Sequence, residues 1–468
     1  MSLPKARTHK DYQEFVRKEL TLRRIKIPLK FQDVAIKLYQ LDLSPVSHIL
    51  KDRYSHRGTS GRDPQDMLRS LLAMTELGIT SIDDWVDSLR SFPELAIISG
   101  FLPEDTPGVG TFYDFFNRLY LMDKEKSCAK GKTKFRRKPK KRKEDHLPEH
   151  EHKGIIRRLV ERAMRESSKE KNGESSYKPP DYLLQKIFKE CFVLPSARLG
   201  LIDLNNLSVA GDGSKIKTCA SPYGKKICSC EGPCNHPRIF SDRDARWGWD
   251  SFHEIWIYGY GIHALVEVKS ELPIILPKLS GANTHDGVIG VDLIREAIRW
   301  GYRIKHAIFD SAYDNYHFYR FLVDWCHTSP IIMLNKRCEG ISYNKDLIFF
   351  TPDGVPMCLY GLPLANWGFC WDRGRNKWRC PICSLVQYKD EECPYRGICQ
   401  RRVSDYGRVF YTYPKENYRY FTPVPRDTEL WDELYAKRSG CERSFKREKE
   451  DYKLGTTRGE GKRCGLLK

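Results

Sequence analysis

Four residues near the C-terminal end have the types and spacing of a catalytic group. They are Tyr435, Arg438, Glu442 and Lys449. At about 100° per residue, one continuous helix would bring their side chains within roughly 60° of one another around its axis. A single carboxylate would then lie among phenolic and cationic donors. The alternative is a solvated helix whose ion pairs contribute about 0.3 kcal/mol each.

A glycine in the same segment favours the catalytic interpretation. Gly440 stands two residues before Glu442. In a helix interior it costs about 1 kcal/mol relative to alanine, so it calls for a reason. We expect it to permit close approach by another backbone or by a ligand.

Two aspartates follow predicted strands and complete a set of three acids with Glu442. Asp212 comes after the apolar run 207–210, and Asp310 comes after the run 305–309. Three acids from separate elements predict a site for divalent ions. A pair of ions about 3.5–4 Å apart can activate an attacking oxygen and stabilise the leaving oxygen of a phosphoryl displacement. Mg²⁺ suits such a site because it prefers oxygen ligands and phosphates.

The elements that must position these acids alternate between strands and helices, which predicts an α/β core. The predicted strands are 207–210, 255–266, 273–276, 305–309 and 331–334, and the predicted helices are 286–300 and 316–325. His285 and Asp286 follow the third strand and could assist the site, although a helix cap explains Asp286 equally well.

The rest of the chain divides by composition into further segments. Residues 1–123 read as helices, one beginning near Pro64 and ending before Gly78 and another capped by Ser81, and they suit DNA binding or a plain helical bundle equally. The predicted segments are 1–123 helical, 124–180 basic flexible linker, 181–335 first part of the core, 336–426 β-rich insertion, 427–455 catalytic helix and 456–468 irregular tail. The basic run 130–143 could bind DNA or serve only as a solubilising tether.

The charge balance predicts a polyanionic partner. Lys and Arg total 80 against 61 Asp and Glu, a net charge of +19. Nucleic acid is the leading candidate, because no stretch approaches the roughly 20 apolar residues of a membrane span. The charged N-terminus lacks the apolar core of a signal peptide, so we expect a cytoplasmic, nucleoid-associated protein.

In a reducing compartment the sixteen cysteines are candidate metal ligands rather than a disulfide framework. The spacing of Cys380, Cys383, Cys393 and Cys399 fits a structural Zn²⁺, with buried free thiols as the alternative. A second group has irregular spacing that leaves its ligand set open: Cys219, Cys228, Cys230, Cys234 and His236.

These motifs, in this order, resemble the DDE transposases of bacterial insertion sequences. Tyr435, Arg438, Glu442 and Lys449 match the Tyr-x2-Arg-x3-Glu-x6-Lys signature of one large group, and Asp310-Ser-Ala-Tyr matches its second-aspartate motif. Asp212 matches the first aspartate. The helical region around 61–119 also resembles the N-terminal domain that accompanies these enzymes.

The resemblance implies a ribonuclease-H-like catalytic core, interrupted by a β-rich, Cys-containing insertion and preceded by an all-helical N-terminal domain. It implies that the three acids bind two Mg²⁺ ions, for which Mn²⁺ can substitute, and that Tyr435, Arg438 and Lys449 contact DNA. The implied partners are double-stranded DNA, both terminal inverted repeats and target, and a second copy of the chain. Insertion tryptophans 367, 371 and 378 could stack on a flipped base, but core or turn packing is the stronger interpretation.

The sequence departs from the resemblance after Lys449. The segment 455–468 is polar and rich in glycine, where the family continues its helix and adds an apolar segment, so we expect a shortened end that weakens support for the Glu442 helix. Two alternatives to a transposase stay open: a non-catalytic DNA-binding relic or repressor, and a hydrolytic nuclease without strand transfer.

Overall fold

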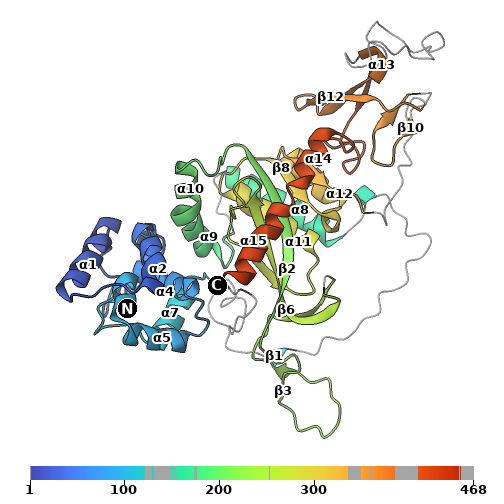
Figure 1. Ribbon diagram of the computed structural model, residues 1–468. Coiled ribbons are helices and arrows are strands. Elements are labelled where there is room, and N and C mark those ends of the chain that lie inside the picture. Colours follow the sequence, from blue (N-terminus) through green and yellow to red (C-terminus); the bar gives the residue numbers. More distant parts are fainter. Residues whose placement is uncertain are drawn as a thin grey trace.

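The computed structural model combines a helical N-terminal part, a central sheet covered by helices, and a smaller β-rich part (Figure 1). It describes residues 2–121, 129–130, 149–151, 154–172, 177–251, 253–335, 349–358, 361–384, 409–452 and 454. Within these ranges the predicted α/β class with a preceding helical region is confirmed. The expected tail at 456–468 and the basic residues 131–143 lie outside them.

The N-terminal part packs most of its helices around one apolar core that includes the fully buried Trp85, while α1 packs against Ile97 in a separate small cluster through Tyr12 and Val16. The predicted helix ends are confirmed: α4 begins at Pro64, Gly78 follows it with φ of 66°, and the Ser81 hydroxyl caps α5. The Asp63 side chain caps α4, which was not predicted from the sequence. The helices are α1 His9–Leu22, α2 Leu29–Gln40, α3 Pro45–Ile49, α4 Pro64–Glu76, α5 Ile82–Ser91, α6 Pro93–Ser99 and α7 Val109–Arg118.

The segment expected to be a flexible linker, 124–180, contains an ordered helix, α8 (Ile155–Lys171). The prediction was wrong there because charged residues cover only the solvent side of α8, while Val160 and Ala163 are buried in the core of the sheet. Helix α9 (Tyr182–Phe188) then packs into the N-terminal core through Leu183 and Ile187. The path to the sheet continues through a π-helical turn at Lys189–Val193 and α10 (Leu194–Arg198).

The central sheet has the strand order β5-β6-β2-β8-β9, with β7 also paired to β6. Strand β2 runs antiparallel to β6 and parallel to β8, and β8 is parallel to β9. The strands are β2 Leu207–Lys217, β5 Arg246–Asp250, β6 Ile255–Glu267, β7 Lys278–Gly281, β8 Ile304–Phe309 and β9 Ser329–Ile332. The third strand predicted at 273–276 was misplaced, because Ile274 and Ile275 are buried core residues outside any strand.

Helices cover both faces of this sheet. On one face α8, α11 (Asp286–Arg299) and α12 (Tyr316–Arg320) pack on side chains such as Leu207 and Val209, followed by a π-helical turn at Phe321–Trp325. On the other face α14 (Glu429–Ala436) and α15 (Ser439–Glu450) pack on Ala210 and its neighbours. The alternation along β2 therefore anchors two layers to one strand.

Short strands lie between β9 and α14, within the segment 336–426 that was predicted to be β-rich. The exact boundaries of that segment stay a prediction. Its small core contains Trp378, whose indole N–H donates to Thr412 Oγ1 at 2.8 Å. Trp378 thus packs in a core, whereas Trp367 and Trp371 are about half exposed. The elements are β10 Phe349–Phe350, β11 Pro356–Met357, β12 Ala365–Cys370, β13 Arg375–Arg379, α13 Pro381–Ser384 and β14 Val409–Thr412.

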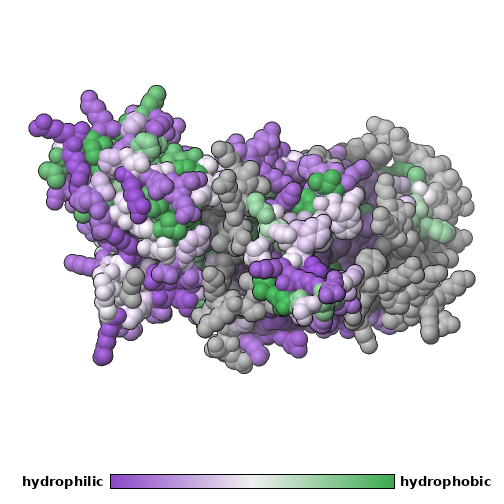
Figure 2. Space-filling view, turned by 90° about the horizontal axis from the view of Figure 1, so that it is seen from below, coloured by the Kyte–Doolittle hydropathy of each residue, from purple (hydrophilic) through white to green (hydrophobic). Residues whose placement is uncertain are grey.

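The surface is largely hydrophilic on the face shown in Figure 2, where hydrophobic side chains gather only in small separate groups. Among the described helices, none has the length and apolar character needed to cross a membrane.

Candidate active site

Asp212 and Asp310 lie at the same edge of two neighbouring parallel strands. The pairing of β2 with β8 ends at Ala210 and Ile308, so each aspartate stands two residues past the last pair. Asp310 caps the 3-10 helix Ser311–Tyr313 by accepting a hydrogen bond from the Ala312 N–H at 3.0 Å. The expected end of the first strand was wrong, because β6 continues to pair with β2 beyond Asp212 as far as Lys217.

Glycines on both sides of Asp212 allow this edge to pack closely. A Cβ on Gly211 would lie 2.1 Å from the Phe309 ring, and one on Gly213 would lie 2.7 Å from His263 Nδ1. Neither position has room for a larger residue without movement of its neighbours. Steric constraints therefore explain why a glycine stands on each side of the aspartate in the Ala-Gly-Asp-Gly sequence.

The helix that carries Glu442 is interrupted, contrary to the predicted continuous stripe. Helix α14 ends at Ala436 and α15 begins at Ser439 (Figure 1). Between them the Arg438 N–H donates to the carbonyl oxygen of Tyr435 at 2.9 Å. This bond spans three residues, as in a 3-10 helix, so the turn is tighter than that of an α-helix. Leu434 and Cys441 both pack on the same face of the sheet, and this turn allows the two helices to do so in different directions.

Arg438 is the centre of the candidate site. Its Nη2 lies 2.6 Å from Glu442 Oε1, and its Nη1 lies 3.6 Å from Asp212 Oδ2. Two acids from β2 and α15 therefore contact one guanidinium. Burial raises the pKa of Asp310, and the charge of the same guanidinium opposes part of that rise. The structure thus brings Asp212, Asp310, Glu442 and Arg438 together.

The other two members of the signature differ in how close they lie to this contact. Burial raises the pKa of Tyr435, and the charge of Arg438 and its hydrogen bond with the tyrosine oppose that rise. The Tyr435 ring stacks on Trp431 with ring centroids 4.8 Å apart, at the edge of the site. Lys449 is half-buried on α15 two turns beyond Glu442, about 10 Å along the axis, and lies outside the ion pairs around Arg438.

In the protein alone, burial and neighbouring negative charges disfavour the ionised forms of the two aspartates. Burial, together with the neighbouring carboxylates Asp310 and Asp286, raises the pKa of Asp212 to about 6, although the Gly213 N–H and Arg438 act in the opposite direction. Burial and Asp286 also raise the pKa of Asp310. A cation bound between them would remove this penalty.

Asp286 and His263 also lie at the site. For Asp286 the sequence left two roles open, assistance to the site or a helix cap, and it gave no role to His263. Asp286 Oδ1 lies 3.7 Å from His263 Nδ1, and both atoms are buried without a hydrogen-bond partner. Burial lowers the pKa of His263 to about 4, so the ring is neutral near pH 7. A histidine inside a 13-residue apolar strand was the available signal.

The carboxylate oxygens of the site are of the type that binds divalent ions, although they do not all lie close enough to one another to share one ion. In the described ranges only a group of cysteines and one histidine has all its ligand atoms within 4.8 Å of one another. Asp212 and Glu442 instead pair with Arg438, and Asp286, whose Oδ1 has no hydrogen-bond partner, is close enough to raise the pKa of Asp212 and Asp310. Oxygen donors of this number and charge are those that Mg²⁺ prefers.

The predicted zinc ligands of the insertion fall largely outside the described residues. Cys380 follows β13 and is half-buried. The side chain of Cys383, and the whole of Cys393 and Cys399, lie outside the described part of the chain. That zinc site stays a prediction.

Comparison with protein families gives one match. Residues 208–463 match the family model described as transposase DDE domain. This segment covers more than half of the 468 residues and contains Asp212, Asp310 and Glu442. Comparisons with curated proteins and with solved structures give no match.

Proposed function

Because this chain belongs to the transposase DDE domain family, we propose that it cuts DNA at the ends of an insertion sequence and joins the freed 3′-hydroxyl to target DNA. The observation that carries the proposal is that Asp212 and Glu442 both pair with Arg438, while Asp310 lies beside Asp212 beyond the paired ends of β8 and β2. A protein that only binds DNA does not need three acids from separate elements at one sheet edge. Divalent metal use is general in this family.

The order of the strands supports a ribonuclease-H-like core. Three antiparallel strands, β5, β6 and β2, continue into two parallel strands, β8 and β9. The first and second acids then lie on neighbouring strands, and the third comes from a helix that returns after the β-rich part.

In the proposed mechanism Asp212, Asp310 and Glu442 hold two Mg²⁺ ions. When bound, these ions activate the attacking oxygen and stabilise the leaving oxygen. Each step, first hydrolysis and then strand joining, breaks one P–O bond and forms another without a covalent protein intermediate. The sheet edge supplies the fixed positions of the two aspartates.

Arg438 is proposed to exchange partners during this cycle. If Asp212 and Glu442 were to bind metal, Arg438 would lose both of its carboxylate partners. Its planar guanidinium is then available for two hydrogen bonds to a DNA phosphate. Tyr435 and Lys449 are proposed to contact the same strand on either side, and two copies of the chain are proposed to bridge two DNA ends.

The test is a joining assay with purified protein, terminal repeats of the element, Mg²⁺ and a plasmid target. Glu442→Gln should abolish cleavage and joining. Glu450→Gln is the matched control, since Glu450 lies on the same helix with its side chain 64% exposed. Cleavage without joining would indicate a nuclease, DNA binding alone would indicate a relic or repressor, and full activity of Glu442→Gln would refute the site.

A further inference from the structure

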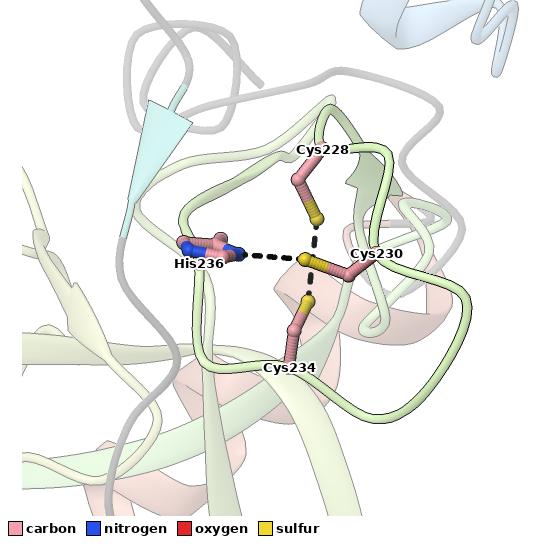
Figure 3. Close-up of side chains that lie close together, drawn as sticks. All are labelled: Cys228, Cys230, Cys234 and His236. Atoms are coloured by element: carbon pink, nitrogen blue, oxygen red, sulfur yellow. Dashed lines mark hydrogen bonds between the residues drawn. The ribbon is translucent and has the colours of Figure 1, made fainter.

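A cluster of three cysteines and one histidine lies away from the carboxylates, in the loop between β2 and β5. Cys228, Cys230, Cys234 and His236 point toward one another, and their ligand atoms all lie within 4.8 Å of one another (Figure 3). The Sγ atoms of Cys228 and Cys234 are 3.3 Å apart, and Cys230 Sγ is 3.4 Å from His236 Nδ1. The first distance exceeds the roughly 2.05 Å of a disulfide.

The surrounding loop has little apolar burial of its own. Strand β3 (Lys225–Lys226) pairs with β4 (Arg238–Ile239) to form a short ribbon that projects from the sheet, at the end away from the β-rich part (Figure 1). From 221 to 239 every side chain is exposed or intermediate, and Phe240 is the first buried residue beyond the ribbon. Chain segments with so small a core usually depend on a metal or on disulfides.

We propose that Cys228, Cys230, Cys234 and His236 bind a structural Zn²⁺ ion. Three thiolates and an imidazole are the ligand types of structural zinc, and four protein ligands leave no open position for catalysis. With Zn–S bonds of about 2.3 Å, tetrahedral ligand atoms lie about 3.8 Å apart, a separation compatible with the cluster. Cys219, in the same loop, is outside the set.

Bound zinc would fix the turn that joins β3 to β4. Strand β4 also pairs with β1 (Ala129–Lys130), at the start of the basic run 130–143. The ion would thereby hold Lys225, Lys226 and Arg238 on one ribbon beside the point where that run begins. The zinc proposal depends on the cluster alone and does not require that the chain be a transposase.

The first test uses the unaltered full-length protein, so that misfolded variants cannot confuse it. Iodoacetamide labelling followed by peptide mass spectrometry should show slow labelling of Cys228, Cys230 and Cys234. Labelling of these three should accelerate at least tenfold when a zinc-selective chelator is added, while the exposed Cys219 labels quickly in both conditions. Equal rates with and without chelator, or a disulfide between Cys228 and Cys234, would overturn the proposal.

The second test measures zinc content by plasma mass spectrometry. Cys230→Ser and Cys234→Ser should each contain one zinc equivalent less than the wild type, and Cys219→Ser should retain the wild-type content. The difference is the readout because the predicted site at Cys380 would contribute its own ion. Unchanged zinc in Cys230→Ser would refute the assignment, and loss from Cys219→Ser would show that the ligand set is wrong.

Discussion

The carboxylate site and the Cys/His cluster are assembled in opposite ways. Glu442 follows Asp212 by 230 positions, and the two meet because β2 and α15 pack through one hydrophobic layer. The four residues of the cluster lie between positions 228 and 236 and meet in a single turn. The first arrangement therefore depends on the whole core, whereas the second depends on the ion that it binds.

The two sites also differ in how their charges are balanced before metal arrives. In the carboxylate site a protein cation, Arg438, stands between Asp212 and Glu442. In the cluster, thiols and an imidazole contact one another: Cys228 Sγ lies 3.3 Å from Cys234 Sγ, and Cys230 Sγ lies 3.4 Å from His236 Nδ1 (Figure 3). The first site therefore has oxygen ligands and a protein counter-charge, whereas the second has the thiolate and imidazole ligands typical of structural zinc.

The largest expected effect comes from removing one carboxylate while leaving the fold unchanged. Asp310→Asn should lower DNA cleavage by about 10³-fold, since loss of metal-dependent stabilisation of about 4 kcal/mol has that effect on rate. Asparagine can still accept the Ala312 hydrogen bond and cap the 3-10 helix. Rates come from strand-cleavage gels, and DNA affinity and zinc content should match the wild type.

The control for that variant is Asp87→Asn on α5, where the side chain is 79% exposed. It should cleave at the wild-type rate. Cleavage by Asp310→Asn within tenfold of the wild type would contradict the proposed role of the carboxylate.

A second variant removes support of the core beneath the carboxylate site. Asp314 binds the buried Arg419 through Nε at 2.8 Å and Nη2 at 2.6 Å. Asp314→Asn would remove the charge of the carboxylate that forms two hydrogen bonds with this buried guanidinium, and should lower the free energy of unfolding by about 3–5 kcal/mol. Urea denaturation measures the change, and the folded fraction should retain its zinc.

The matched control breaks an exposed ion pair instead. Arg443 lies 2.6 Å from Glu271 with 55% of its side chain exposed, so Arg443→Ala should cost less than about 1 kcal/mol. Equal losses of unfolding free energy in Asp314→Asn and Arg443→Ala would show that the buried ion pair does not stabilise the protein more than the exposed one.

Sequence patterns predicted the parts of the molecule in which local chemistry and structure agree. The helix start at Pro64, the cap at Ser81, the helix from Asp286 and the strand before Asp310 are each visible from a few neighbouring residues. The break between α14 and α15 was not predictable, because it depends on how two helices pack on a sheet that is distant in sequence. His263 was missed for the same reason: its neighbour Asp286 comes from another element.

The ligands of the proposed zinc site also could not be assigned from the sequence alone. The spacing of the second cysteine group could not decide among five candidate ligands, since irregular spacing fits several turns. The three-dimensional turn selects four of them and excludes Cys219. A local cluster can therefore be recognised from sequence, but its ligand set depends on backbone geometry.

Acidification should weaken the core through His306, which is buried on β8 with Nδ1 2.8 Å from Ser208 Oγ. Burial lowers its pKa to about 4, against about 6.5 in the unfolded chain. The unfolded chain binds more protons between these values, so the stability is fully present above pH 6.5 and is lost as pH falls toward 4. The expected loss is about 2–3 kcal/mol.

The measurement is urea denaturation at several pH values. His306→Gln should show a shallower loss of stability between pH 6.5 and 4 than the wild type, whereas His56→Gln, at an exposed position, should keep the wild-type slope. Identical slopes for all three proteins would exclude His306 as a source of the acid sensitivity. Zinc content at each pH separates this effect from loss of the ion.

The smallest expected effect concerns Gly440 in the first turn of α15, where sequence suggested a need for close approach. A Cβ there would lie 3.7 Å from Val268 O and from Glu271 Cγ, which is ordinary van der Waals contact. Gly440→Ala should therefore raise the free energy of unfolding by about 0.5–1 kcal/mol through helix propensity, with cleavage unchanged. Gly211→Ala is the contrast, since its Cβ would lie 2.1 Å from the Phe309 ring and should destabilise the sheet edge that holds Asp212. If Gly440→Ala instead loses cleavage at full stability, the space beside Glu442 is needed by DNA, and the glycine belongs to the site and not to the packing of α15.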